Sequence, residues 1–250
     1  MKWSSFGLTD VGKRRESNED DFVVDAPCGL YAVADGMGGH AAGEVAARLA
    51  IQTLTDAFRG DGRPAHQFDA VGASEHLSQA VERANRRIFE EVVSTQEYRG
   101  MGTTVVTLLV STDRAIIGHV GDSRAYRLRD GILERLTSDH SYVNEQVKLG
   151  LLSEEDAERH PMRNIVTRAL GNRVDIHVDL LEDVPRHGDL YLLCSDGLNT
   201  MLSDHEIKKN LEMHAGDPEK ACRALVEAAN ARGGEDNVTV IVVRTDPADG

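Results

Sequence analysis

The sequence predicts an α+β fold in which antiparallel β-sheets are covered by helices. Two observations predict it: short apolar runs typical of strands, and helices that come in consecutive pairs between groups of strands. Strict alternation of strand and helix would favour a parallel sheet, whereas paired helices favour antiparallel sheets with helices on their faces. With 250 residues, 40% of them apolar, the chain can bury a substantial core, and we expect it to form a single domain over residues 1–250.

Seven short runs of aliphatic or β-branched residues, bounded by Gly, Asp or Ser, predict the strands. They are residues 22–24, 30–34, 104–110, 115–120, 125–128, 190–194 and 238–243. The step Asp130-Gly131 joins residues 126–128 to residues 132–136, with polar alternation on both sides. Asp-Gly is a strong signal for a two-residue hairpin turn, so these two segments are expected to pair.

Four segments predict long helices. Apolar residues recur with a 3.6-residue period between residues 47 and 58 and between residues 77 and 92. A capping-box pattern, Ser203 to Glu206, opens a third helix that is expected to run to about Met213. Asp217-Pro218 begins a fourth, which Gly233-Gly234 ends. The polar, helix-like residues 138–170 predict a surface subdomain.

Composition excludes several classes of function. Lys and Arg total 28 and Asp and Glu total 42, which gives a net charge of −14 and argues against nucleic-acid binding. Three cysteines without a CxxC pair predict neither a disulfide framework nor a zinc ribbon. No apolar stretch approaches the ~20 residues that a membrane-spanning helix needs. We therefore expect a cytoplasmic protein that neither crosses a membrane nor binds nucleic acid.

Acidic residues stand at the ends of the predicted strands. Asp35, Asp122 and Asp196 each follow an apolar strand, Glu19-Asp20 precedes the first strand, and Asp236 precedes the last. If these strand ends meet, the carboxylates repel one another unless they are protonated or hold cations. Oxygen donors without a Cys/His cluster favour Mg²⁺ or Mn²⁺. Two such ions could share a water and make it a hydroxide nucleophile.

Turn chemistry is the alternative for any Asp-Gly step, and for most of them it is the stronger interpretation. Asp35 and Asp196 differ, because the residues after them lead into a helix rather than a returning strand. Residues 36–41 also match the dinucleotide-binding pattern G-x-G-x-x-A, a weak alternative because no second strand follows the helix. Near these acids, Arg15 is a candidate for binding a phosphate and His40 is a candidate for a role in the site, whereas His119 is expected to be a packed, hydrogen-bonded strand residue.

Six motifs in this order resemble the protein phosphatase 2C family, the metal-dependent serine/threonine protein phosphatases, in its compact bacterial form. They are Arg15-Glu-Ser-Asn-Glu-Asp20, Val33-Ala-Asp-Gly-Met-Gly-Gly-His40, Gly100-Met-Gly-Thr-Thr104, Gly118-His-Val-Gly-Asp-Ser-Arg124, Ser195-Asp-Gly197 and Gly234-Glu-Asp-Asn-Val238. The resemblance covers nearly the whole chain. It implies a central antiparallel β-sandwich flanked on both sides by pairs of helices, with residues 138–170 as the family's variable flap.

The resemblance also implies roles for single residues. Asp35 would bridge two Mn²⁺ or Mg²⁺ ions, the Gly36 carbonyl would bind one of them, and Asp196 and Asp236 would bind the other. Asp122, with Asp196, would match a third metal position. Glu19 and Asp20 would hold metal-bound waters, and Arg15 would bind the substrate phosphate. Asn237 of the last motif is a further candidate.

The activity implied is hydrolysis of phosphoserine and phosphothreonine in proteins by a metal-bridging hydroxide, opposing a cognate Ser/Thr kinase, with the chain acting as a monomer. Animal members have a histidine two residues after the bridging aspartate, whereas this chain has Met37. The proton donor for the leaving alkoxide is therefore unassigned. Two rival functions remain: a non-catalytic phosphoprotein-binding module of the same fold and, more weakly, a dinucleotide-binding oxidoreductase.

Overall fold

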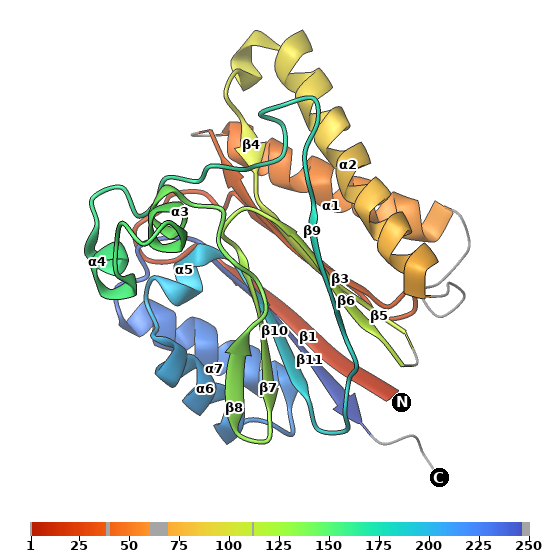
Figure 1. Cartoon of the computed structure of the whole chain (residues 1–250), viewed down its shortest axis with the longest axis vertical. Helices are drawn as coiled ribbons and strands as arrows, with labels where there is room; N and C mark the ends of the chain where they lie inside the picture. Colours follow the sequence, from red (N-terminus) through yellow and green to blue (C-terminus); the bar gives the residue numbers. More distant parts are fainter. Residues whose placement is uncertain (1, 39–40, 61–69, 112, 247–250) are drawn as a thin grey trace.

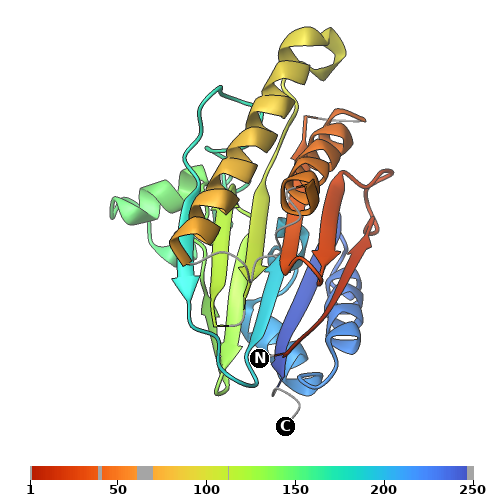
Figure 2. The same cartoon turned by 90° about the vertical axis from the view of Figure 1, so that its right-hand side faces the viewer.

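Two antiparallel sheets stack face to face, and helices cover both outer faces (Figures 1 and 2). The computed structural model describes residues 2–38, 41–60, 70–111 and 113–246. Within these residues, no helix combines the length and apolar character needed to span a bilayer. The layered α+β architecture is the one that the sequence predicts.

The first sheet has the strand order β1-β11-β10-β7-β8. Its strands are β1 (Lys2–Asp10), β11 (Val238–Asp246), β10 (Leu190–Cys194), β7 (Arg124–Arg129) and β8 (Ile132–Arg135). Every neighbouring pair is antiparallel. In the turn between β7 and β8, Asp130 has a φ of 51° and Gly131 a φ of 73°. Two successive residues of positive φ are what a tight hairpin turn of this kind requires, so the predicted hairpin is confirmed.

The second sheet has the order β2-β3-β5-β6-β9, and β4 pairs with the end of β3. Its strands are β2 (Asp20–Asp25), β3 (Leu30–Met37), β4 (Gly102–Thr103), β5 (Val105–Val110), β6 (Ala115–Val120) and β9 (Asp179–Asp183). These pairs are antiparallel as well. An antiparallel sheet does not build the parallel nucleotide-binding unit, so the dinucleotide-binding alternative is wrong.

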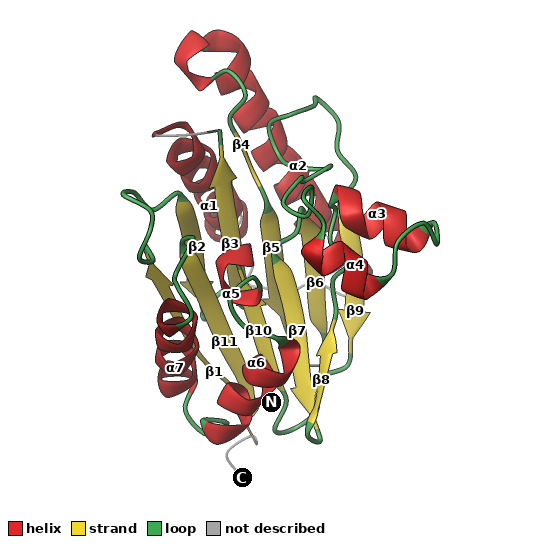
Figure 3. Cartoon of the chain, turned by 90° about the vertical axis from the view of Figure 1, so that its left-hand side faces the viewer, coloured by secondary structure: helices red, strands yellow, loops and turns green. Residues whose placement is uncertain are grey.

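Helices α1 (Ala41–Gly60) and α2 (Ala70–Ser94) cover the second sheet, while α6 (Asp204–Met213) and α7 (Pro218–Ala231) cover the first (Figure 1). The capping box at Ser203 and the cap at Asp217 are both formed, as predicted. The short helix α5 (Asp196–Asn199) follows β10, and a 3₁₀ turn (Gln96–Tyr98) follows α2. Residues 138–170 carry α3 (Tyr142–Lys148) and α4 (Glu154–Arg159), which lie outside the sandwich (Figure 3).

Three hydrophobic layers hold these elements together, and alternation along the strands creates them. In β3, Leu30, Ala32 and Ala34 pack toward α1 and α2, whereas Tyr31 and Val33 pack between the two sheets. A third layer lies between the first sheet and α5 to α7. Because a central strand is apolar on both faces, it has the continuous apolar sequence from which it was predicted.

Candidate metal centre and active site

The predicted strand-end acids converge at one end of the sandwich. The pairing of Asp20 with Asp35 sets the start of β2 beside the end of β3, and the pairing of Cys194 with Val240 does the same for β10 and β11. The chain thereby lines one cavity of about 360 Å³ with acids from both sheets. The acids are Glu19, Asp35, Asp122, Asp196 and Asp236.

Asp35 is fixed by the strand that follows α2. Its carbonyl accepts hydrogen bonds from the Thr104 backbone N–H (2.9 Å) and from Thr103 Oγ1 (2.9 Å). Its own N–H donates to Thr104 Oγ1 (3.2 Å). The backbone around Asp35 is therefore held from both sides, which aims the carboxylate into the cavity that it lines.

Gly36 and Gly197 allow close approaches that a side chain would prevent. A Cβ on Gly36 would lie 2.2 Å from the Gly43 carbonyl oxygen in the first turn of α1. A Cβ on Gly197 would lie 2.0 Å from the Asn237 carbonyl oxygen. Both contacts are with backbone, so neither position can accept a side chain without movement of the chain. These glycines determine how near α1 and α5 come to the strands that carry the acids.

The side chain of Asn237 connects chain segments through hydrogen bonds, so it is not free to act as a ligand. Its Oδ1 accepts from the Glu19 backbone N–H (2.8 Å), and its Nδ2 donates to the carbonyls of Val11 (2.9 Å) and Ser17 (3.0 Å). Its side chain is thus engaged with the segment that leads into β2. The candidate Asn237 therefore joins Asp236 and Glu19 by joining the chain segments that carry them.

Asp20 is the strand partner of Asp35 but is not among the residues that line the cavity. It is buried, and its Oδ2 accepts hydrogen bonds from Ser195 Oγ (2.8 Å) and Thr239 Oγ1 (2.6 Å). Ser195 is the residue directly before Asp196. Asp20 thus connects the start of β2 to the loop that presents Asp196.

The carboxylates are held under strong mutual repulsion. Burial, followed by the charges of Asp20 and Asp196, raises the pKa of Asp35 well above its usual range. Burial and the charge of Asp196 raise the pKa of Asp122 to about 7. Burial and Asp236 raise the pKa of Asp196 to about 6. Such a set of oxygen donors is suited to hard divalent cations, which relieve the repulsion that the protein alone leaves in place.

Arg15 is the basic residue among those lining the cavity. Its Nη2 donates to Asp236 Oδ2 at 2.6 Å, and about half of its side chain is exposed. Because Arg15 lines the cavity, the N–H groups that it does not use on Asp236 can bind phosphate oxygens in the fork geometry of a guanidinium.

Other residues of the site were not singled out from the sequence. Asn164 and Val166, from the segment of residues 138–170, line the same cavity, and so does Thr104. Thr104 belongs to one of the quoted motifs, but no local pattern marks Asn164 or Val166. His40 lies outside the described residues. His119 is buried and bonded to the Ser138 carbonyl (3.2 Å), as expected for a packed strand histidine.

Comparison with known proteins decides the family. The family model described as protein phosphatase 2C matches residues 12–233. The chain belongs to the protein phosphatase 2C family. The matched residues include four of the five cavity acids, Glu19, Asp35, Asp122 and Asp196. The fifth, Asp236, lies three residues beyond the end of the matched region.

A named relative and a solved structure are similar to this protein phosphatase 2C over nearly its whole length. The serine/threonine phosphatase stp of Listeria monocytogenes is 38% identical over 95% of this chain and 94% of its own. The Mycobacterium tuberculosis serine/threonine phosphatase PstP/Ppp has a TM-score of 0.88 at 36% identity, covering 99% of this chain and 100% of that one.

The PstP catalytic domain has also been solved in complex with two manganese ions, and it matches with a TM-score of 0.87 at 36% identity over 98% of this chain and 99% of that one. The family's dependence on divalent metal thus agrees with the oxygen-rich cavity of this chain.

Proposed function

We propose that this protein phosphatase 2C hydrolyses phosphoserine and phosphothreonine in proteins with the help of divalent metal ions. The observation that carries the proposal is the cavity in which carboxylates from both sheets face one arginine. The relatives named above support catalysis over a binding-only module. So does the complete set of acids, because loss of a central acid would favour binding alone.

The donor set fits Mn²⁺ or Mg²⁺. Asp35, the Gly36 carbonyl, Asp196 and Asp236 would hold two ions, and Asp122 with Asp196 would hold a third. All are oxygen donors, and burial together with the neighbouring carboxylates raises the pKa values of Asp35, Asp122 and Asp196. When bound, such ions lower the pKa of a water molecule and stabilise negative charge on the phosphoryl group.

The protein's own residues bind and orient the substrate. Arg15 would bind the phosphate through the N–H groups that it does not use on Asp236. Glu19 and Asp20 would orient water at the start of β2. Met37 lines the cavity but carries no exchangeable proton, so the leaving alkoxide does not obtain its proton from this position.

We further infer that the whole chain acts as one catalytic domain, with residues 138–170 as a flap at the site. We infer that the chain acts as a monomer, since the five acids of the cavity all belong to one catalytic domain. The free thiols of its three cysteines are compatible with a reducing compartment, the cytoplasm. A phosphoprotein substrate requires a Ser/Thr kinase to make it, and this phosphatase would oppose that kinase.

The test compares the wild type with Asp35→Asn in hydrolysis of an aryl phosphate and a phosphopeptide in Mn²⁺. We expect kcat/KM to fall by about 100- to 1,000-fold, since charge stabilisation by the metals contributes several kcal/mol. Asp130→Asn is the matched control, because it changes an Asp-Gly step in the β7–β8 turn and should retain activity. Full activity in EDTA would contradict the proposal. Mn²⁺ binding without turnover would favour the binding-only module.

A further inference from the structure

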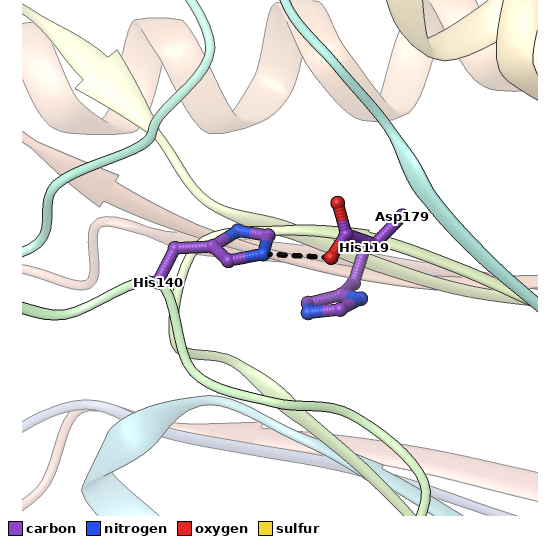
Figure 4. Close-up of side chains that lie close together, drawn as sticks. All are labelled: His119, His140 and Asp179. Carbon is purple, nitrogen blue, oxygen red and sulfur yellow. Dashed lines mark hydrogen bonds and ion pairs between the residues drawn. The ribbon is translucent and has the colours of Figure 1, made fainter. Parts of the chain in front are cut away.

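Three side chains from separate parts of the chain meet beside the Asp122 loop. They are His119 of β6, His140 at the base of the flap, and Asp179 of β9, and their donor atoms lie within 4.8 Å of one another (Figure 4). Both histidines are buried, and their rings stack with centroids 4.5 Å apart. Two imidazoles and a carboxylate are a common ligand set for transition metals, so the direction of each hydrogen bond decides what this cluster does.

The hydrogen bonds of His140 exclude a metal on its ring. The Gly121 backbone N–H donates to His140 Nδ1 at 3.0 Å, so this nitrogen is the acceptor of the ring. Nε2 lies 3.2 Å from Asp179 Oδ2 and 2.8 Å from Arg168 Nη1, so an acidic and a basic side chain both face this nitrogen. A metal-bound histidine needs the opposite arrangement, with a lone pair toward the metal and a donor on its other nitrogen. His140 is therefore a hydrogen-bonding residue.

The surroundings keep this ring neutral. Burial, with His119 and Arg168, lowers the pKa of His140 to about 4. Although burial raises it, hydrogen bonds from Arg168 and His140 lower the pKa of Asp179 to about 2, so the carboxylate is ionised. Arg168 Nη2 donates to Asp179 Oδ1 at 2.7 Å and holds this carboxylate in place. The ring thus lies between the Gly121 N–H at Nδ1 and the Arg168–Asp179 pair at Nε2.

His140 forms two hydrogen bonds with Gly121. Besides the bond to Nδ1, the His140 backbone N–H donates to the Gly121 carbonyl at 2.9 Å. Gly121 has a φ of 114°, and a Cβ there would lie 2.6 Å from Thr104 Cβ. Gly121 thus packs closely on Thr104 and is hydrogen-bonded to His140. Asp122, the next residue, points into the cavity from this fixed position.

The base of the flap fastens the other side of the same loop. Arg124 forms a two-pronged ion pair with Asp139, with its Nη2 2.7 Å from Asp139 Oδ2. The residue before His140 thus holds the chain two positions after Asp122. The C-terminal end of the flap is bonded to His140 as well, since the Thr167 N–H donates to the His140 carbonyl at 2.8 Å.

We propose that His140 is a positioning residue for Asp122: its Nδ1 accepts the Gly121 N–H, and the Arg168–Asp179 pair holds the ring in place from its other side. The flap and β9 thereby set where Asp122 meets a divalent cation. This inference rests on the proposed function, because it takes Asp122 as a metal ligand. It assigns no contact with substrate to His140.

The test compares His140→Leu with His140→Asn. Leucine removes the acceptor, whereas the asparagine Oδ1 takes nearly the position of Nδ1 and can still accept from Gly121. In H140L we expect Mn²⁺ affinity, measured by calorimetry, to fall by about 10- to 100-fold at the weakest site. Exchange of the Gly121 amide hydrogen, followed by NMR, should accelerate by at least about tenfold. H140N should remain within about threefold of wild type in both measurements.

The control is His177→Leu, because His177 is 85% exposed and lies 3.8 Å from the same Asp179. Unchanged Mn²⁺ affinity in H140L, or equal losses in H140N and H140L, would overturn the inference. If H140L does not fold, wild type and H140N still test the inference. Fast exchange of the Gly121 amide in the wild type would refute the hydrogen bond from Gly121 to His140. A wild type that binds Mn²⁺ but hydrolyses no phosphopeptide contradicts the proposed function instead.

Discussion

Single residues set the spacing between the carboxylates, and Gly197 is the clearest example. It lies between Asp196 and the rest of α5, and its backbone packs directly on the carbonyl of Asn237. Asn237 in turn follows Asp236. The distance between these two acids is therefore fixed by a backbone-to-backbone contact that tolerates no side chain.

We expect Gly197→Ala to destabilise the protein by about 1–3 kcal/mol, because the new methyl group forces two backbone segments apart. Urea unfolding of the metal-free protein measures this loss. Mn²⁺ affinity should also fall, since Asp196 and Asp236 would separate. Gly216→Ala is the matched control, because a Cβ there meets no atom within 4 Å. Equal stabilities of the two variants would show that the contact at Gly197 yields without cost.

At the scale of elements, the far end of the sandwich depends on ion pairs between the two sheets. Asp183 of β9 accepts hydrogen bonds from Arg127 Nη1 of β7 (2.6 Å) and from the hydroxyl of Tyr191 of β10 (2.6 Å). It pairs with Ala115, at the end of β6 away from Asp122. This joint links the sheets without touching the cavity.

Asp183→Asn is expected to lower the free energy of unfolding by about 1–3 kcal/mol, because it removes one of the two carboxylates that pair with the largely buried Arg127 and leaves only Glu134. Mn²⁺ affinity should not change. Burial opposes ionisation of Asp183, but the hydrogen bonds from Tyr191 and Arg127 lower its pKa overall. The stabilisation by ionised Asp183 is therefore present near neutral pH and disappears as the pH falls through this lowered pKa. A variant that loses Mn²⁺ binding as much as stability would contradict this separation.

The elements also show what sequence could predict. Central strands such as β5 and β10 are apolar on both faces and were predicted, and capping residues predicted where α6 and α7 begin. Strands β1 and β9 were missed because they lie at sheet edges and mix polar with apolar residues. Their partners, β11 and β6, are distant in the chain, so only tertiary pairing makes them strands.

The same distinction holds for the site. Acids at strand ends were predicted to meet because strand direction brings those ends together. The contacts of Asn164, and the bond from Gly121 to His140, connect segments whose placement depends on how the flap folds back. No spacing along the chain encodes them, and the roles of the individual acids stay predictions.

The whole molecule places the site across both sheets. Asp35 lies in β3 of the second sheet, and Asp122 lies in the loop from β6 of the second sheet to β7 of the first. Asp196 and Asp236 flank strands of the first sheet. Stacking of the sheets therefore concentrates part of the net charge of −14 in one cavity. Metal binding and folding are coupled through this charge, because ions that neutralise it stabilise the stacked state alone.

The coupling predicts how stability depends on pH. The folded-state pKa values of Asp20 and Asp122, about 7, and of Asp196, about 6, exceed the ordinary value of 3.8. Without metal, and between the ordinary and the raised pKa values, these carboxyl groups stay protonated in the folded chain, whereas the same groups are ionised in the unfolded chain. Their contribution to stability is thus complete below about pH 4 and is lost as the pH rises to about 7. Divalent cations displace the same protons and reverse this loss.

We therefore expect Mn²⁺ to raise the melting temperature more at pH 8 than at pH 5.5, where protons compete for the carboxylates. Thermal melts of EDTA-treated protein with and without Mn²⁺ at both pH values measure the difference. Groups that the metal does not touch, such as Asp183, cancel in this comparison because they titrate equally in both samples. In Asp196→Asn, the dependence of the Mn²⁺ effect on pH should shrink, since one competing carboxylate is gone. An identical rise at both pH values would mean that the ions bind away from the buried carboxylates.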